Sequence, residues 1–429
     1  MRKIIAAWVL YDLAYGAFPL IVTTFVIATY VTTAIAPTGG AAHWAAMQAV
    51  AGMVIAGLAI PLGRAADTGG GRRLGLRLCS LALVTATAAL WWVRPHAGHE
   101  WRALVLVGTA TIAFELALIF YNAMLPELAP AGQLGRLSML GWAAGYVGGL
   151  VALELCLLLL ILPDPPLFGL DHASAEPVRA CAVLAALWMT LFGWPLLLWA
   201  PPDPPARQAT SLRSLLRHCR RDRALSRFLL ARLLYMDGIT TLLAFGGIYA
   251  ATEFALSQSE VLVFGLGITA TAALGLLAGA VLEDRIGSQR TVLASLLVLI
   301  LLGGVLLLTH SRLGLWVAGL ALGPFVGPAQ AASRSLMAHL APAGERAAYF
   351  GLFALSGRVS AFLGPLVLSV LTASSGSLRL GMASILVFLA AGAALLASMP
   401  ATRRPTAPAA PATPHSRSIA AAAPVPGTE

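Results

Sequence analysis

Twelve stretches of about 20 or more predominantly apolar residues run through the chain, and each is long enough to cross a lipid bilayer as a helix. The 429 residues are 59% hydrophobic and only 11% charged, which is too few charged residues for a soluble globular protein. The stretches are also too long for the strands of an outer-membrane barrel. The sequence therefore predicts an all-α integral membrane protein with twelve transmembrane helices, at about 4–36, 41–63, 74–93, 102–121, 137–162, 178–200, 225–250, 259–281, 291–309, 313–336, 348–372 and 378–399.

The basic residues are unevenly divided between the two sides of these spans. With the N-terminus inside, 21 of the 28 Lys and Arg residues fall in cytoplasmic segments, Arg334 among them, and 5 fall in outer loops. Arg232 and Arg358 lie within spans. This asymmetry predicts a multi-pass protein of the cell (inner) membrane with both termini in the cytoplasm. The net charge of +10 is thus explained by topology, and no nucleic-acid partner is expected.

A proline- and arginine-rich segment at 201–224 divides the spans into two sets of six. We expect an N-terminal six-helix bundle at 1–200, a cytoplasmic basic linker at 201–224 and a C-terminal six-helix bundle at 225–399. Within the linker, Ser211–Arg223 fits either a short amphipathic helix on the anionic inner leaflet or a solvated connection. The Pro- and Ala-rich tail at 400–429 is expected to be disordered.

Two patterns recur in register in the second half. Leu128-Ala-Pro-Ala-Gly132 returns as Leu340-Ala-Pro-Ala-Gly344, an offset of 212 residues. The loop after the second span also has a counterpart after the eighth, at an offset of 217 residues. The two loop sequences are Gly63-Arg-Ala-Ala-Asp67-Thr-Gly-Gly70-Gly-Arg72-Arg73 and Ala280-Val-Leu-Glu-Asp284-Arg285-Ile-Gly287-Ser-Gln-Arg290. The two halves are therefore interpreted as a duplication.

Twelve spans in two sixes, a basic central loop and this loop motif resemble the major facilitator superfamily. The resemblance is closer to the branch related to fungal vacuolar effluxers of the autophagy set. The matching stretches are Trp8–Ala14, Phe114–Pro126, Gly135–Trp142, Asp237-Gly238, Ser333–Ser335 and Phe350–Arg358. The resemblance implies two pseudo-symmetric six-helix bundles and transport, with amino-acid efflux suggested for fungal members.

Ionisable residues inside spans are candidates for the transport pathway, because they are costly to insert into a membrane. Asp12 and Asp237 lie about 12 and 18 Å into the first span of each half, from the helical rise. The resemblance implies that these spans line a central cavity. The two carboxylates are predicted to bind a cationic group or exchange a proton, or else to hold neighbouring spans by hydrogen bonds.

Three further candidates accompany these carboxylates. Arg358, about 14 Å into its span, is predicted either to hold a substrate carboxylate or to form a structural ion pair with Glu115. Glu115 is alternatively a proton site. Tyr11 and Tyr15 share a helical face next to Asp12, and they either offer hydroxyls to a substrate or pack as aromatic rings.

The repeated loop motif is predicted to act as a gate. Its glycines allow close helix approach, while Asp67 or Asp284 can cap a helix N-terminus or pair with an arginine. Pure loop structure is the alternative. The residues assigned to the motif are Gly63, Asp67, Gly70, Arg72, Arg73, Asp284, Arg285 and Gly287.

No nucleotide-binding or hydrolase motif accompanies the spans, so neither enzyme activity nor a cofactor is expected. The four cysteines are interpreted as buried apolar thiols, and no metal site is expected. The leading hypothesis is a monomeric secondary active transporter in the lipid bilayer, which moves a small polar solute, such as an amino acid, and is coupled to protons. A drug or metabolite exporter of the same fold is the alternative, and a membrane-embedded enzyme or a sensor is the alternative from another class.

Overall fold

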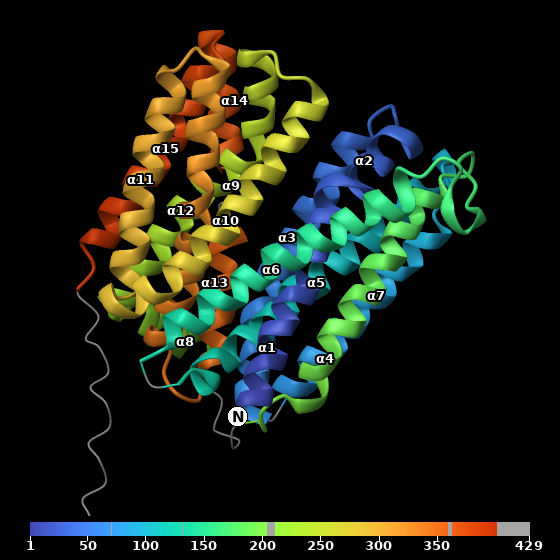
Figure 1. The fold of residues 1–429 in the computed structure, drawn as a ribbon. Coiled ribbons are helices and arrows are strands. Elements are labelled where there is room, and N and C mark those ends of the chain that lie inside the picture. Colours follow the sequence, from blue (N-terminus) through green and yellow to red (C-terminus); the bar gives the residue numbers. More distant parts are fainter. Residues whose placement is uncertain (70, 131, 204–210, 359–362, 401–429) are drawn as a thin grey trace, which may run out of the picture.

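The computed structural model describes residues 1–69, 71–130, 132–203, 211–358 and 363–400, and the elements assigned within them are all helical. The first half contains α1 (Arg2–Tyr15), η1 (Pro19–Phe25), α2 (Ile27–Thr29), η2 (Tyr30–Ile35), α3 (Gly40–Gly69), α4 (Arg72–Ala89), η3 (Leu90–Trp92), η4 (Ala97–His99), α5 (Glu100–Leu128), α6 (Leu134–Cys156), η5 (Leu157–Ile161), η6 (Leu167–Gly169) and α7 (Glu176–Trp199). The second half contains α8 (Leu212–Arg221), α9 (Arg223–Phe254), α10 (Gln258–Ile286), α11 (Ser288–Leu308), α12 (Arg312–Leu340), α13 (Arg346–Arg358), α14 (Leu363–Ser375) and α15 (Leu378–Ala397). Figure 1 shows the two halves as neighbouring helical bundles, with the N-terminus at the end where they meet.

Eleven of the twelve predicted spans are present as helices long and apolar enough to cross a membrane, within the described residues. The predicted span at 348–372 corresponds to α13 and α14, and residues 359–362 between them lie outside the described ranges. The prediction of an all-α membrane protein agrees with these helices.

The over-long first span is one continuous helical segment with a change of winding. Pro19 lacks the N–H that would bond to the fourth residue before it, and wider π-helical turns begin there as η1. The segment as a whole, Arg2–Ile35, still counts as a single crossing.

Side-chain caps fix where several helices begin in the second half. Asp222 accepts hydrogen bonds from the backbone N–H groups of Ala224 and Leu225 and so starts α9. Ser257 and Glu260 form a reciprocal capping box at the start of α10. Before the first of these caps, the linker contains α8, which agrees with the helix expected within Ser211–Arg223. The tail at 401–429 lies outside the described residues.

The two halves pack most extensively through two equivalent helix pairs. α3 of the first half lies against α13 of the second, and α6 of the first half lies against α10 of the second. Large apolar side chains such as Leu301 and Val387 remain exposed on the outside of the bundles, as expected for a surface that faces lipid. These inter-bundle contacts bring the loop motifs and several charged residues together.

Candidate inter-bundle transport site

Asp67, at the end of α3, caps the first turn of α13 in the opposite half. Its carboxylate oxygens accept hydrogen bonds from the backbone N–H groups of Ala347, at 3.1 Å, and Ala348, at 2.8 Å. A carboxylate at this position satisfies two free amide groups and interacts favourably with the helix dipole. Gly63 makes the approach possible, because a Cβ atom there would stand 2.3 Å from the carbonyl oxygen of Ala347.

Asp284, near the end of α10, makes the corresponding contact with α6. Its Oδ1 atom accepts a hydrogen bond of 3.0 Å from the backbone N–H of Arg136. Gly135 provides the close approach here, since a Cβ atom on it would lie 2.6 Å from the carboxyl carbon of Glu283. The predicted capping role is thus present in both halves, and it crosses between the bundles each time.

The remaining residues of the motif divide between an ion-pair cluster and the linker. Glu127 of α5 contacts Arg72 at 2.8 Å and Arg346 at 3.3 Å, so it joins α4 to the start of α13. Arg73 donates to the carbonyl oxygen of Pro201 at 2.8 Å and so binds the linker. Arg285 lies in the last turn of α10, and Gly287 follows it with a φ of +90°, a conformation that favours glycine. Gly70 lies outside the described residues.

Asp12 forms an ion pair with Arg334 between α1 of the first half and α12 of the second. The Oδ2 atom of Asp12 lies 3.1 Å from Nη1 of Arg334, and the side chains are only 12% and 3% exposed. Arg334 also donates to the hydroxyl and the backbone carbonyl of Ser138 in α6. The assignment of Arg334 to a cytoplasmic segment was therefore wrong, because this arginine lies buried between the bundles inside α12.

Aromatic rings surround the guanidinium of Arg334. Its Cζ atom lies 5.0 Å from the ring centroid of Trp8 and 5.8 Å from those of Tyr121 and Trp142. These distances fall within the range of cation–π attraction. Gly141 of α6 completes the enclosure, since a Cβ atom there would stand 2.3 Å from Oδ2 of Asp12.

A second cation, Arg232 of α9, is also buried and does not extend to a span end as a snorkelling side chain would. It donates to the carbonyl oxygen of Phe353 at 2.7 Å and to the hydroxyl of Ser356 at 2.8 Å. It also interacts electrostatically with Glu115 of α5. The structure thus gives Glu115 a cationic neighbour in the opposite half, and the predicted pairing of Glu115 with Arg358 stays a prediction. The side chain of Arg358 lies outside what the structure describes.

Asp237 of α9 lies deep in the second half, and it contacts a different helix from Asp12. It is 1% exposed, and its two carboxylate oxygens have no side-chain hydrogen-bond partner among the described residues. Gly364 of α14 packs against it and against the hydroxyl of Thr241, one turn further along α9. A buried carboxylate in these surroundings is costly when it is charged, which is the property expected of a cation or proton site.

Tyr11 and Tyr15 face the interior of the first half. Their hydroxyls lie 2.7 and 3.0 Å from the Ser80 hydroxyl, and their rings stack with centroids 4.1 Å apart. Both side chains are almost completely buried. This placement favours the aromatic-packing interpretation over direct contact with a solute.

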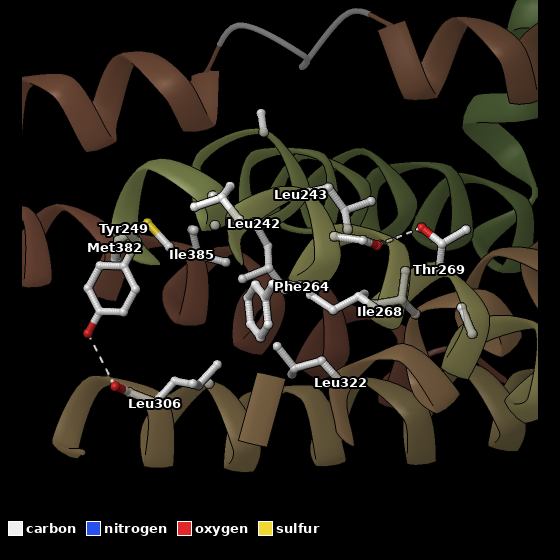
Figure 2. Close-up of a pocket in the computed structure, with 18 of the residues that line it drawn as sticks. Leu242, Leu243, Tyr249, Phe264, Ile268, Thr269, Leu306, Leu322, Met382 and Ile385 are labelled. Carbon is white, nitrogen blue, oxygen red and sulfur yellow. Dashed lines mark hydrogen bonds between the residues drawn. The ribbon is translucent and has the colours of Figure 1, made fainter. Parts of the chain in front are cut away.

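A pocket of about 350 Å³ lies toward the other end of the second half, away from the capping contacts. Figure 2 shows its wall, which includes Leu242, Phe264 and Leu322. Leu20, Thr24, Phe25 and Tyr146 of the first half complete it. Within the described part of the chain, no group of three or more His, Cys, Asp or Glu residues could hold a metal ion.

Comparison with known proteins agrees with this architecture. Residues 40–407 match the model of a family described as vacuole effluxer Atg22 like. The chain is 24% identical over 408 residues to the uncharacterized MFS-type transporter YxiO of Bacillus subtilis (strain 168), covering 92% of the chain and 94% of that protein. It is 26% identical over 290 residues to autophagy-related protein 22-2 of Aspergillus clavatus, covering 59% of the chain but only 46% of that longer protein.

Solved structures show the same fold at low sequence identity. The MFS transporter FucP, crystallised in the outward conformation, superposes with a TM-score of 0.74 at 14% identity, covering 94% of this chain and 98% of FucP. The human organic anion transporter MFSD10 superposes with a TM-score of 0.70 at 18% identity, covering 92% of this chain and 99% of MFSD10.

Proposed function

Because the chain belongs to the vacuole effluxer Atg22-like family of MFS-type transporters, we propose that it moves a small solute by alternating access and couples that movement to protons. Its homologues and its fold are those of transporters and not of enzymes. Efflux is the direction that the description of the family suggests.

In this proposal, residues 1–200 and 225–399 form the two moving halves, and 201–224 is the connection between them. The 21-to-5 division of basic residues supports cytoplasmic termini in a cell membrane, with the capping contacts at the cytoplasmic end. The buried Arg334 is removed from that count, and the asymmetry remains. We propose a monomer that works within the lipid bilayer.

The Asp12–Arg334 ion pair carries the proposal of proton coupling. It is largely buried and joins helices that must separate if the two halves rock about a central site. Protonation of Asp12 would remove its negative charge and leave Arg334 with uncharged oxygen acceptors, such as those of Ser138. The contact between the halves would then weaken, so uptake of a proton would favour the opposite conformation.

The capping contacts of Asp67 and Asp284 supply the gate in the same scheme. Both must break when the end at which the bundles meet opens. Because each contact consists of hydrogen bonds to backbone N–H groups, water can replace it at modest cost. The gate can therefore hold the closed state without making the transition prohibitively slow.

A polar solute such as an amino acid would need partners for its two charges. Asp237 is the proposed partner for an ammonium group, because it is buried without a cation among its described neighbours. Arg358 is the proposed partner for a carboxylate. Glu115, which already interacts with Arg232, is the alternative proton site.

The direct test is uptake into proteoliposomes from a panel of amino acids and drugs, with and without an imposed pH gradient. We expect gradient-driven uptake by the wild type and its loss in Asp12→Asn. Asp222→Asn is the matched control. It makes the same change of carboxylate to amide, but Asp222 caps the start of α9 and makes no contact with the other half among the interactions described. Equal, gradient-independent uptake by wild type and Asp12→Asn would refute the coupling.

A further inference from the structure

We propose that the pocket in the second half binds an uncharged, largely apolar solute that carries hydrogen-bond donors. This inference rests on the transport function proposed above and specifies a class of solute for it. It favours a drug-like or metabolite-like compound over a free amino acid at this place. The lining of the pocket, its hydroxyl groups and its glycines each support the inference independently.

The wall of the pocket has no group that could neutralise a charge. Among the described residues that line it there is no Asp, Glu, Lys, Arg or His, and most are Leu, Val, Ile, Phe, Met, Ala or Gly. An ammonium or carboxylate group entering the pocket would lose its hydration without gaining a counter-charge. An apolar body, in contrast, would be driven in by the burial of its surface.

Four hydroxyls line the pocket, those of Thr24, Tyr146, Tyr249 and Thr269, and the last two have a fixed hydrogen-bond direction. The hydroxyl of Tyr249 donates to the carbonyl oxygen of Leu306 at 3.2 Å, and that of Thr269 donates to the carbonyl oxygen of Gly265 at 2.9 Å, as Figure 2 shows. Each of these two hydroxyls has used its only hydrogen and still has a free lone pair. Both are therefore available as acceptors, which suits a solute with N–H or O–H donors.

Glycines provide the space in the pocket. A Cβ atom added to Gly246 would meet no heavy atom within 4 Å, and one added to Gly265 would meet only Phe25, at 3.9 Å. Gly275, which lies in α10 like Gly265, is different, since a Cβ atom there would stand 2.3 Å from Cα of Pro324. Gly275 is thus needed for helix packing, whereas Gly246 and Gly265 leave room for a ligand.

The pocket also touches both halves of the protein. Leu20, Thr24, Phe25 and Tyr146 come from the first half, while the other lining residues come from α9, α10, α11, α12 and α15. A solute held there contacts surfaces that move relative to each other in alternating access. Its binding would therefore differ between the two conformations, as a transported solute requires.

The experiment uses the full-length protein in detergent and four compounds that share a phenyl ring. N-acetyl-L-phenylalaninamide is neutral and has N–H donors, L-phenylalanine is a zwitterion, phenylethylamine is a cation and 3-phenylpropionate is an anion. We expect the neutral amide to raise the Tm and, by calorimetry, to bind at least about tenfold more tightly than the other three. Equal binding of the zwitterion, or no binding of the amide, would overturn the inference.

Cavity-filling variants locate the binding site. Gly265→Leu and Gly246→Leu place a side chain in the pocket without a backbone clash, and each should weaken binding of the amide at least about tenfold. Gly304→Leu is the matched control, because Gly304 also has open space around it and does not line the pocket. It should leave the Kd within about twofold. If both pocket variants bind like the wild type, the site lies elsewhere.

Binding and transport can fail separately. If the amide binds in the pocket but is not taken up by proteoliposomes, the pocket inference stands and its transport role is refuted. If amino acids are taken up while the amide does not bind, the transport function stands and the pocket inference is refuted.

Discussion

Asp67 and Asp284 occupy equivalent positions in the two halves, and each caps a helix of the other half. The residues they cap are equivalent as well, because Arg136 and Ala348 are separated by the same 212 residues as the repeated Leu-Ala-Pro-Ala-Gly segments. The closed end of the protein is thus held by two copies of one contact. This arrangement makes the effect of breaking a single copy predictable.

Asp67→Asn should shift the protein toward the conformation in which the closed end is open. The amide removes the negative charge near the start of α13 and one of the two acceptors, at a cost of about 1 kcal/mol or about fivefold in population. Spin labels at Leu162 and Leu308 on the far ends of the two bundles can report the change, and we expect shorter distances between them. Asp171→Asn removes an exposed loop carboxylate and should leave the distances unchanged. Identical distance distributions in Asp67→Asn and the wild type would contradict the gate.

Gly141→Ala should destabilise the protein and impair transport together. The added methyl group would overlap Oδ2 of Asp12 and the ring of Trp8, and such overpacking costs about 1–3 kcal/mol. A lower Tm in detergent and reduced uptake in proteoliposomes measure the two effects. Gly304→Ala, which meets no atom within 4 Å, is the control and should not lower the Tm. A Gly141→Ala protein with wild-type Tm would mean that α1 and α6 lie further apart.

Arg334→Met should lower the free energy of unfolding more than the double variant that combines Arg334→Met with Asp12→Asn. The single change leaves a buried carboxylate without its cation, which costs about 3–5 kcal/mol, whereas the double change leaves no net charge. Unfolding free energies in mixed micelles for the wild type, both single variants and the double variant form a thermodynamic cycle. We expect a coupling of at least about 1 kcal/mol. Additive effects would show that the two residues do not interact.

Ser80→Ala should lower stability without changing the apparent affinity for solute. The hydroxyls of Tyr11 and Tyr15 would lose a buried partner, at a cost of about 1–3 kcal/mol. The Tm should fall, while the KM for uptake stays within about twofold of the wild-type value. A large change in KM at constant Tm would instead place these tyrosines in the solute pathway.

Cys219 should react slowly with alkylating reagents at neutral pH. Burial, together with the nearby charge of Asp222, raises the pKa of this thiol to about 11, so the protonated form predominates below that pH. The rate of alkylation by iodoacetamide, measured by mass spectrometry, should rise about tenfold per pH unit up to about pH 11. In an Arg213→Cys variant, the introduced thiol lies on the exposed face of α8 and should react about 100-fold faster at pH 8. Equal rates would mean that α8 does not stay packed on the bundle.

The spans could be predicted closely because hydropathy follows the thickness of the membrane. The predicted span at 178–200 corresponds to Glu176–Trp199 and that at 291–309 to Ser288–Leu308. Helix ends were less accurate, since helices such as α5 and α9 continue beyond their apolar stretch. The π-helical turns after Pro19 were not foreseen, because hydropathy does not record how a helix is wound.

The partners of the charged residues could not be predicted in the same way. Arg334 was assigned to the cytoplasm because it lies near the end of its apolar stretch, although Ser333–Ser335 had already been noted as a matching segment. Depth along a span gives no information about which helix of the other half faces a side chain. The shared face of Tyr11 and Tyr15 could be predicted from their spacing along one helix. Their partner Ser80 could not, because it lies on another helix, α4. The ion pairs of Glu127 with Arg72 and Arg346 were not predicted either. Glu127 follows an apolar stretch, as many ordinary loop residues do, so its position in the sequence did not mark it.

The reciprocal caps also bear on the origin of the protein. If a single six-helix unit preceded the duplication, its aspartate could reach the corresponding amide groups only in a second copy, across a two-fold axis. Such a unit would have been a homodimer with the same contact made twice. Fusion of the two copies then freed each half to diverge, so that one now carries the buried aspartate of the ion pair and the other the arginine.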